Sequence, residues 1–347
     1  MNQKLKSTVR GVINQARRTL IKDKKTQKLL AVRYNNLQVM MHGNRKPIDT
    51  TFDVQAIMSG PQKFYCDEKY HGNVHFGIAK AIKDYAGIHG CLNCCIEHGV
   101  YFGDYVAEDE AVDSGFPKLI TFGRQRVEHL KKVSNVEIIP IGPYIYYASP
   151  SLSDEEIETI HKKNGKTLLV FPTHSIDRVD MEFDTDLFIQ RIEAFQRDHG
   201  FEKVMVCLFY KDIMLGREKA YMERGFQVVS AGYRDDPMFL RRLKSFILLS
   251  DYTASNDVGT HVGYCVSLGK PHIVFEQAIK PKPYTKNDLE SVTNSFNDTV
   301  QSEKTGVQRA FSAYQSDITP DQYQLVERFW GTDYLRNRDE LKKLLID

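Results

Sequence analysis

Long hydrophobic runs are absent from this sequence. No stretch of about 18 or more apolar residues occurs, so no segment is predicted to cross a membrane. The first residues, MNQKLKSTVRGVINQARR, contain no apolar stretch like that of a signal peptide. The sequence also has no short internal repeat and no low-complexity segment. We therefore expect a globular protein that stays in the cytoplasm.

Cysteine is scarce, with six in 347 residues, and one group of them has a spacing of interest. Cys91, Cys94 and Cys95 form a C-x-x-C-C sequence that could be half of a zinc site. No second pair of Cys or His residues at ligand spacing accompanies it, and the surrounding segment GCLNCCI has the composition of a buried strand. We therefore predict small buried side chains here and no metal site.

The chain also lacks a large excess of either charge. Lys and Arg number 47 and Asp and Glu number 45, and a net charge of +2 argues against a protein that binds nucleic acid with its whole surface. Residues 1–30 differ, because they hold nine Lys or Arg and one acid. Leu5, Val9, Val12 and Ala16 recur there at helical spacing. Such a basic helix could rest on an anionic membrane surface, or it could pack its apolar stripe on its own domain.

The length allows two domains of ordinary size, and 41% of the residues are hydrophobic. From about residue 75, helices such as the one predicted over residues 73–87 alternate with apolar strands such as KTLLVFP. This alternation is typical of parallel sheets covered on both faces. Two such runs, joined near residues 148–166, predict an α/β protein with two doubly wound domains.

Local signals refine this outline. Ser153 and Glu156 form a capping box and predict the start of a helix. The run SFILLS, residues 245–250, is predicted as a strand. The polar segment after Gln277 is predicted to be irregular or helical. The chain ends in two amphipathic segments, and Trp330, its only tryptophan, lies where a terminal helix could dock.

In doubly wound sheets, ligands collect at the carboxyl ends of the strands, so polar residues that follow strands are candidates for a site. Glu97 and His98 follow GCLNCCI, and His98 could act as a general base near neutral pH. Thr173, His174 and Ser175 follow KTLLVFP and offer donors suited to phosphate oxygens. The alternatives are a histidine bonded to a loop backbone and a plain turn or helix N-cap.

A third polar group follows the strand-like run QVVSAG. Gly232 and Arg234 could line a nucleotide pocket. Asp235 or Asp236, next to Pro237, is instead expected to cap the following helix. The acidic string EFDTD is likewise expected to cap a helix, and we assign it no metal.

The fourth group, ASNDVGTHVGYCVSLGKP, places many polar residues where a helix begins. Those residues are Ser255, Asn256, Gly259, Thr260 and His261. Free N–H groups and the positive end of the helix dipole favour an anion there, and Gly259 would allow it a close approach. Capping by Asn256 or Asp257 would explain one polar residue but not the whole group. No Walker lysine pattern is present, so an ATPase is not expected.

Together these motifs resemble the bacterial GT-B glycosyltransferases of capsule, O-antigen and teichoic-acid assembly. The segments that carry the resemblance are Glu97-His98-Gly99, similar to their His-Gly motif; Pro172 to Ser175, similar to a phosphate-facing loop; Asp257 to Glu276, similar to their nucleotide-diphosphate helix; and the closing helices from Phe329. The resemblance covers roughly residues 75–345 and is strongest in 225–277.

The resemblance implies two Rossmann-like domains that face each other across a cleft. Residues 1–150 would bind the acceptor, residues 151–300 would bind the nucleotide-sugar, and residues 301–347 would form helices that pack back across the domains. His98 would deprotonate an acceptor hydroxyl, and the sugar would be transferred with inversion. The donor would be held by Thr173, His174, Ser175, Gly232, Arg234, Ser255, Asn256, Gly259, Thr260, His261 and Glu276. Because the helix dipole can replace a metal ion, the resemblance implies no metal and no cofactor beyond the nucleotide-sugar.

The implied acceptor is a growing surface glycan, linked to a lipid at the inner face of the membrane, where residues 1–30 could bind. Glu97 stands where the teichoic-acid type has a tryptophan, which argues against CDP-glycerol as the donor. Glu97 could orient His98 or could itself be the base. Three alternatives remain: an enzyme like a UDP-sugar 2-epimerase, an enzyme like a glycerophosphotransferase, and a nucleotide-binding assembly factor without catalysis. An epimerase would need several acid/base carboxylates and histidines around the sugar, and the sequence presents no such set.

Overall fold

The computed structural model of the chain describes residues 33–34, 37–43, 45–64, 68–106, 115–176, 178–285 and 298–346. The basic segment at residues 1–30 lies outside these ranges, so its predicted helix is not described. None of the helices within the ranges combines the length and the apolar character needed to cross a membrane.

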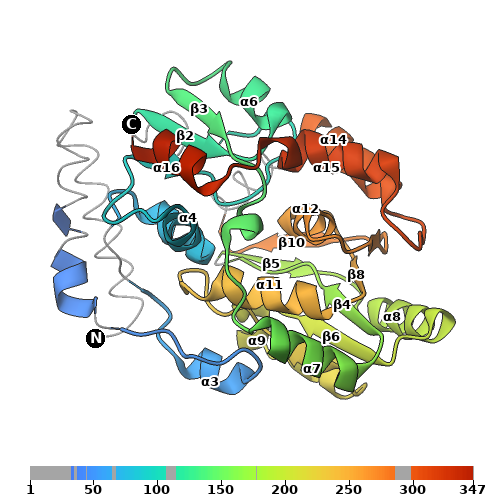
Figure 1. Ribbon diagram of the computed structural model, residues 1–347. Coiled ribbons are helices and arrows are strands. Elements are labelled where there is room, and N and C mark those ends of the chain that lie inside the picture. The colour runs from blue at the N-terminus through green and yellow to red at the C-terminus, as the bar shows by residue number, and fades with distance from the viewer. Residues whose placement is uncertain are drawn as a thin grey trace.

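The larger sheet has five parallel strands. From one edge to the other they are β7 (Gln227–Val229), β6 (Lys203–Cys207), β4 (Thr167–Phe171), β8 (Tyr252–Ser255) and β9 (His272–Val274). Within this sheet, the first strand along the chain is β4, which lies in the middle (Figure 1). The chain then continues outward to β6 and β7, and it returns to add β8 and β9 on the opposite side of β4. In such doubly wound sheets the ligand crevice lies where the winding reverses, which here is between β4 and β8.

Helices cover both faces of this sheet, and the side chains of β4 show why. Leu168 and Val170 point to one face and pack with α8 (Thr185–His199) and α10 (Glu218–Met222). Leu169 and Phe171, which alternate with them, join a second cluster with α11 (Phe239–Leu249) and α12 (Thr260–Ser267). All four side chains are buried, as expected for a parallel strand between two helix layers. The predicted α/β class with parallel sheets is therefore confirmed.

The smaller sheet is built in the same way. Its parallel strands are, in order, β1 (Cys94–Ile96), β2 (Lys118–Thr121) and β3 (Glu137–Pro140). Cys94 packs with the core that includes α4 (Ile78–Ala86), and Cys95 packs on the other face with Leu130 of α6 (Arg124–Leu130). The cysteines within the described ranges are free thiols, and those ranges hold no group of residues able to bind a metal. The predicted domain boundaries at residues 150 and 300 stay a prediction.

The segment before the smaller sheet contacts the larger one. It contains α3 (Val54–Ser59), and the carbonyl of Met58 accepts a hydrogen bond from the hydroxyl of Tyr233 at 2.8 Å. The buried guanidinium of Arg242 donates to the carbonyl of Thr50, also at 2.8 Å. The helix that follows the smaller sheet and leads into β4, α7 (Asp154–Asn164), packs on α11. It begins at the predicted capping box of Ser153 and Glu156, which is confirmed.

The last helices return to both sheets. They are α14 (Asp298–Ala310), α15 (Pro320–Trp330) and α16 (Arg338–Ile346). α15 packs against α12 and α6, and α16 packs against α4 (Figure 1). The ammonium of Lys118 in β2 donates to the carbonyl of Leu344 at 3.0 Å. The chain therefore closes by joining the smaller sheet to the helix layer of the larger one.

The contact between Trp330 and α12 requires a glycine. Trp330 is fully buried, and its indole N–H donates to the carbonyl of Thr260 at 3.0 Å. The indole lies flat on Gly263, where an added Cβ would come within 2.1 Å of the ring.

Gly263→Ala is therefore expected to lower the free energy of unfolding by about 1–3 kcal/mol, because the ring has no space to move into. Urea unfolding measures this effect. Gly306→Ala is the matched control, because an added Cβ at Gly306, within α14, meets no atom within 4 Å. Equal stability of the Gly263→Ala variant and the wild type would contradict the described packing.

The predicted strand at residues 245–250 is wrong. α11 continues to Leu249, and Leu240, Leu243 and Ile247 are buried along one face of it at helical spacing. A short apolar run fits a buried strand and a buried helix equally well, so the composition of SFILLS did not separate them. The strand that precedes the fourth polar group is YTAS, which is β8.

The helix predicted over residues 73–87 is interrupted. A 3-10 helix, η1 (His71–Gly77), leads into α4, and the chain turns where Phe76 and Gly77 adopt left-handed conformations with φ of 57° and 71°. An added Cβ at Gly77 would lie 2.7 Å from the carbonyl oxygen of Pro237. The break therefore brings η1 directly onto the loop after β7.

A two-stranded antiparallel ribbon was not predicted. It pairs β5 (Val179–Glu182) with β10 (Lys280–Pro283). Of the two strands, β10 lies in the segment after Gln277 that was predicted to be irregular or helical. Prolines at positions 281 and 283 disfavour a central strand, but an edge strand tolerates them. The contacts of Lys282 with Glu182 and of Tyr284 with Asp180 add to the pairing.

Candidate functional site

A cavity of about 370 Å³ lies at the carboxyl ends of β4, β6 and β8, in front of the first turn of α12. It therefore occupies the crevice expected where the winding of the larger sheet reverses. Most of its wall is apolar. The sequence-predicted site residues that line it are His98, Thr173, His174, Gly259, Thr260 and His261.

Asn256 ties together the two strands on either side of the crevice. Its side-chain oxygen accepts the backbone N–H of Thr173 at 2.7 Å and the Thr173 hydroxyl at 2.9 Å. Its side-chain amide donates to Gln277 at 3.2 Å. Asn256 is fully buried, so it fixes the loop after β4 and does not line the cavity itself.

The first turn of α12 faces the cavity without a cap. Gly259 occupies the N-cap position, and among the described residues no side chain caps the helix. Capping by Asn256 or Asp257, the alternative explanation of these residues, is therefore wrong. Asp257 instead accepts the N–H of Val258 at 2.8 Å and pairs with Lys304 at 2.7 Å. An uncapped N-terminus with its positive dipole end is suited to an anion.

His261 contributes a neutral imidazole to the helix mouth. Its ring stacks on Phe171 with a centroid distance of 5.0 Å. Burial lowers the pKa of His261 to about 3, and nearby His174 and Lys304 act in the same direction. Within the described part of the chain, its Nε2 atom is buried and has no hydrogen-bond partner. His261 can therefore offer a ligand one hydrogen bond but no positive charge near neutral pH.

Two predicted donor-binding serines are used by the protein itself. The hydroxyl of Ser255 lies 2.9 Å from Nε2 of the buried His272 and donates to the carbonyl of Asp257 at 2.7 Å. The hydroxyl of Ser175 accepts a hydrogen bond from Arg217 at 3.0 Å. Both serines are fully buried and lie outside the cavity wall, so they support the loops that carry their neighbours.

Three further predicted residues also lie outside the wall of the cavity. Gly232 has a φ of 104°, and an added Cβ there would meet the Asp236 carboxylate at 2.8 Å. Arg234 pairs with the neighbouring Asp235. The side chain of Glu276 is exposed after β9. The structure does not bring these residues together with the helix mouth.

Glu97 is fully buried and paired. One of its oxygens accepts from the Arg126 guanidinium at 2.6 Å, and the other accepts from the Thr121 hydroxyl, also at 2.6 Å. Arg126 is itself 2% exposed. Both carboxylate oxygens of Glu97 are therefore engaged below the end of β1, and Glu97 does not line the cavity.

His98 reaches the cavity from the end of β1. Its ring lies beside the ring of Phe76 and within 3.2 Å of the hydroxyl of Tyr101. Two residues further on, the N–H of Val100 donates to the hydroxyl of Thr260 at 3.0 Å. This hydrogen bond fastens the loop that carries His98 to the first turn of α12, so an imidazole and an uncapped helix end share one cavity.

Sequence reasoning missed a second group of side chains beside His98. His75 donates through Nδ1 to Asp235 at 2.9 Å, and His71 lies 3.6 Å from the same carboxylate. Of the two aspartates predicted as alternatives for the helix cap, Asp236 accepts the N–H of Met238 at 2.8 Å, whereas Asp235 is bonded to these histidines. The available signal was the segment HGNVHFG, which contains two histidines four residues apart and two glycines.

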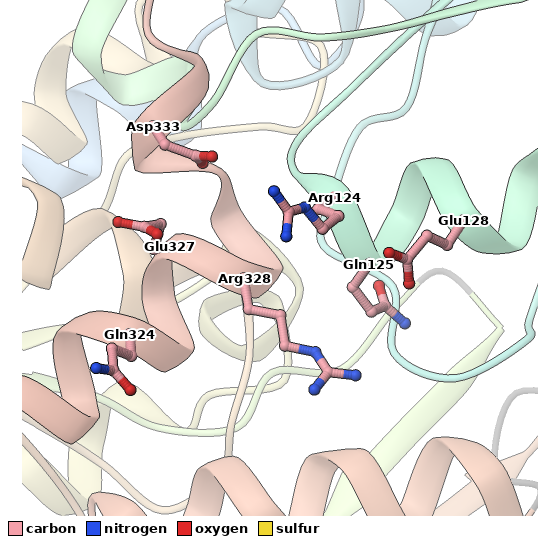
Figure 2. Close-up of a pocket in the computed structure, with 7 residues that line it drawn as sticks. All are labelled: Arg124, Gln125, Glu128, Gln324, Glu327, Arg328 and Asp333. Atoms are coloured by element: carbon pink, nitrogen blue, oxygen red, sulfur yellow. The ribbon is translucent and has the colours of Figure 1, made fainter.

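A second cavity of about 340 Å³ lies between α6 and α15. Figure 2 shows the guanidinium groups of Arg124 and Arg328 between these helices, with the carboxylates of Glu128, Glu327 and Asp333 around them. These charges nearly cancel, so the cavity has no evident preference for a charged ligand.

No family model matches the chain, and no curated protein matches it. Among solved structures it is similar to a UDP-glucose:anthocyanidin 3-O-glucosyltransferase in complex with UDP, with 9% sequence identity and a TM-score of 0.30. The match covers 79% of this chain and 63% of that one, so the chain matches less than two thirds of that protein's length. A likeness at this level leaves the function to be argued from the site.

Proposed function

We propose that this protein is a glycosyltransferase that moves a sugar from a nucleotide-activated donor to an acceptor hydroxyl. One observation carries the proposal. The hydrogen bond from Val100 to Thr260 holds the His98 loop against the uncapped start of α12. We infer that His98 would serve as the base and the helix mouth as the anion site, because both line the same cavity.

The helix mouth would bind the diphosphate of the donor. The N–H groups of the first turn and the dipole of α12 favour negative charge, and the absence of a side chain at Gly259 lets a phosphate approach the backbone. The hydroxyl of Thr260, which accepts from Val100, can donate to a phosphate oxygen at the same time. This arrangement would stabilise the charge that grows on the leaving group, so we propose that transfer needs no metal ion.

His98 would act as the general base. Its imidazole takes the proton of the acceptor hydroxyl, and the acceptor oxygen attacks the anomeric carbon. The bond from that carbon to the diphosphate breaks, and the nucleoside diphosphate leaves with the electron pair. A single displacement of this kind inverts the configuration at the anomeric carbon. A surface glycan linked to a lipid is the proposed acceptor, with residues 1–30 on an anionic membrane surface.

A panel of nucleotides tests the donor class. UDP, CDP, GDP, ADP, dTDP and CMP, with their sugar derivatives, are each added to the full chain, and the melting temperature is measured. We expect one series to raise it, because a ligand at about 100 times its Kd adds about 2.7 kcal/mol of stability. Unchanged melting with every nucleotide would reject the transferase proposal.

Replacing Gly259 with aspartate tests the helix mouth. Asp is a favoured N-cap residue, so the free energy of unfolding should stay equal or rise by about a few tenths of a kcal/mol. A carboxylate about 4 Å from a phosphate would repel it by about 1–4 kcal/mol, so the affinity for the nucleoside diphosphate should fall by about 5- to 1,000-fold. Titration calorimetry measures the affinity.

Gly259→Ser is the matched control, because serine is a neutral N-cap residue of similar size. The backbone of Gly259 is extended, so both side chains fit its conformation, although each Cβ would lie 3.2 Å from the ring of His261. Gly259→Ser should keep most of the affinity. Equal affinities of the aspartate and serine variants would exclude the mouth of α12 as the diphosphate site.

A further inference from the structure

The group around Asp235 lies directly beside His98 but comes from other parts of the chain. His71 and His75 belong to η1, and Asp235 belongs to the loop after β7 in the larger sheet. The ring of His75 lies between its two neighbours, 5.8 Å from the ring of His71 and 5.7 Å from the ring of His98. The contact between His75 and His98 is edge to face, with an angle of 88° between the rings.

The backbone at this point is held in a conformation that needs support. Phe76 has a φ of 57°, and within the described ranges it is the one non-glycine residue with a positive φ. Its N–H donates to the carbonyl of Arg234, next to Asp235. Strained residues of this kind persist where the surroundings fix them, and they gather at functional sites. With this backbone conformation at Phe76, the side chain of His75 reaches Asp235 and the ring of Phe76 packs beside His98.

The charges around Asp235 and His75 determine which atoms of this pair carry a proton. Burial raises the pKa of Asp235, but the hydrogen bonds from His71 and His75 and the charge of Arg234 outweigh it and hold that pKa well below its usual range. Burial lowers the pKa of His75; Asp235 opposes this, whereas Arg234 and His98 add to it. A carboxylate only accepts hydrogen bonds, so the proton of neutral His75 sits on Nδ1 and the lone pair on Nε2.

We propose that His75 and Asp235 are a positioning pair for His98. Asp235 fixes the His75 ring through Nδ1, and the His75 ring fixes the imidazole of His98 through their edge-to-face contact. A neutral imidazole and a buried carboxylate on this side also favour the imidazolium that forms when His98 takes up a proton. The role assigned to His98 rests on the proposed function. The orientation of His98, which follows the smaller sheet, would thus be fixed by the carboxylate of Asp235, which follows a strand of the larger sheet.

Two variants and one control test the pair. Asp235→Asn removes the charge, and His75→Phe keeps a ring beside His98 but removes the bond to Asp235. Both should lower kcat by about 10- to 100-fold, the size of loss seen when an outer partner that orients a functional histidine is removed, with KM for the nucleotide-sugar unchanged. His71→Gln is the control, because His71 is 44% exposed and touches the same carboxylate without facing His98. It should keep the wild-type kcat.

A second measurement separates this inference from the proposed function. In protein with 13C-labelled histidine, the ring signal of His98, assigned through a His98→Gln sample, should move in Asp235→Asn and stay in place in His71→Gln. If no nucleotide-sugar is turned over, the proposed function fails, but this spectrum still decides whether Asp235 positions His98. A His98 signal and a kcat unaffected by both variants would overturn the inference, as would an equal loss of kcat in His71→Gln.

Discussion

Replacing His98 with glutamine is expected to lower the rate of sugar transfer by about 10²- to 10⁴-fold, the usual contribution of a general base. The affinity for the nucleoside diphosphate should stay within about twofold of the wild type, because the proposed diphosphate site is the mouth of α12 and not the end of β1. The rate is measured as release of nucleoside diphosphate from the nucleotide-sugar that stabilises the protein. Titration calorimetry gives the affinity.

Glutamine keeps much of the volume of the imidazole beside Phe76 and Tyr101, so the fold should be retained. His129→Gln is a control, since this partly buried histidine is on α6 and does not line the cavity. A His98→Gln variant that transfers sugar at the wild-type rate would remove His98 from the mechanism. A variant that loses both affinity and rate would show that His98 helps to bind the donor.

Glu97→Ala is expected to lower the free energy of unfolding by about 3–5 kcal/mol. The change leaves the guanidinium of Arg126 buried without its carboxylate partner, and it leaves the Thr121 hydroxyl without its acceptor. Urea unfolding followed by circular dichroism measures the loss. If Glu97 were the general base, the same change would reduce transfer with little effect on stability.

Glu158→Ala provides the comparison for Glu97→Ala. Glu158 pairs with Lys162 at 2.6 Å, but both side chains are more than two thirds exposed. Exposed pairs of this kind contribute about 0–1 kcal/mol. A loss of stability in Glu97→Ala no greater than that in Glu158→Ala would contradict the buried ion pair and return Glu97 to the list of candidate bases.

The alternation of strands and helices could be predicted because the signals are local. The run KTLLVFP is apolar from Leu168 onward, and β4 is buried on both faces accordingly. The failure at residues 245–250 has the same origin, because four consecutive apolar residues fit a strand and the inner face of α11 alike. The pairing of β5 with β10 joins residues about 100 positions apart, so no local sequence pattern predicts it.

The position of several candidate residues at the cavity could be predicted from the sequence, but their contacts could not. Residues that follow strands do gather at the cavity, since the carboxyl ends of parallel strands share one edge of a sheet. Which of them face the ligand depends on partners elsewhere in the chain. Ser255 faces His272 and Asn256 faces Thr173, so their donors and acceptors are already used. His75 was missed because it precedes α4 and does not follow a strand.

The contact of Trp330 with α12 gives the protein a built-in optical signal. The chain contains one tryptophan, so the indole emission comes from a single known position. Its N–H is bonded to the carbonyl of Thr260, the residue that opens α12 and lines the cavity. A ligand that binds to the N–H groups of the first turn of α12 changes the electrostatic environment of that indole. The wavelength of the emission then follows occupancy of the helix mouth in unlabelled protein.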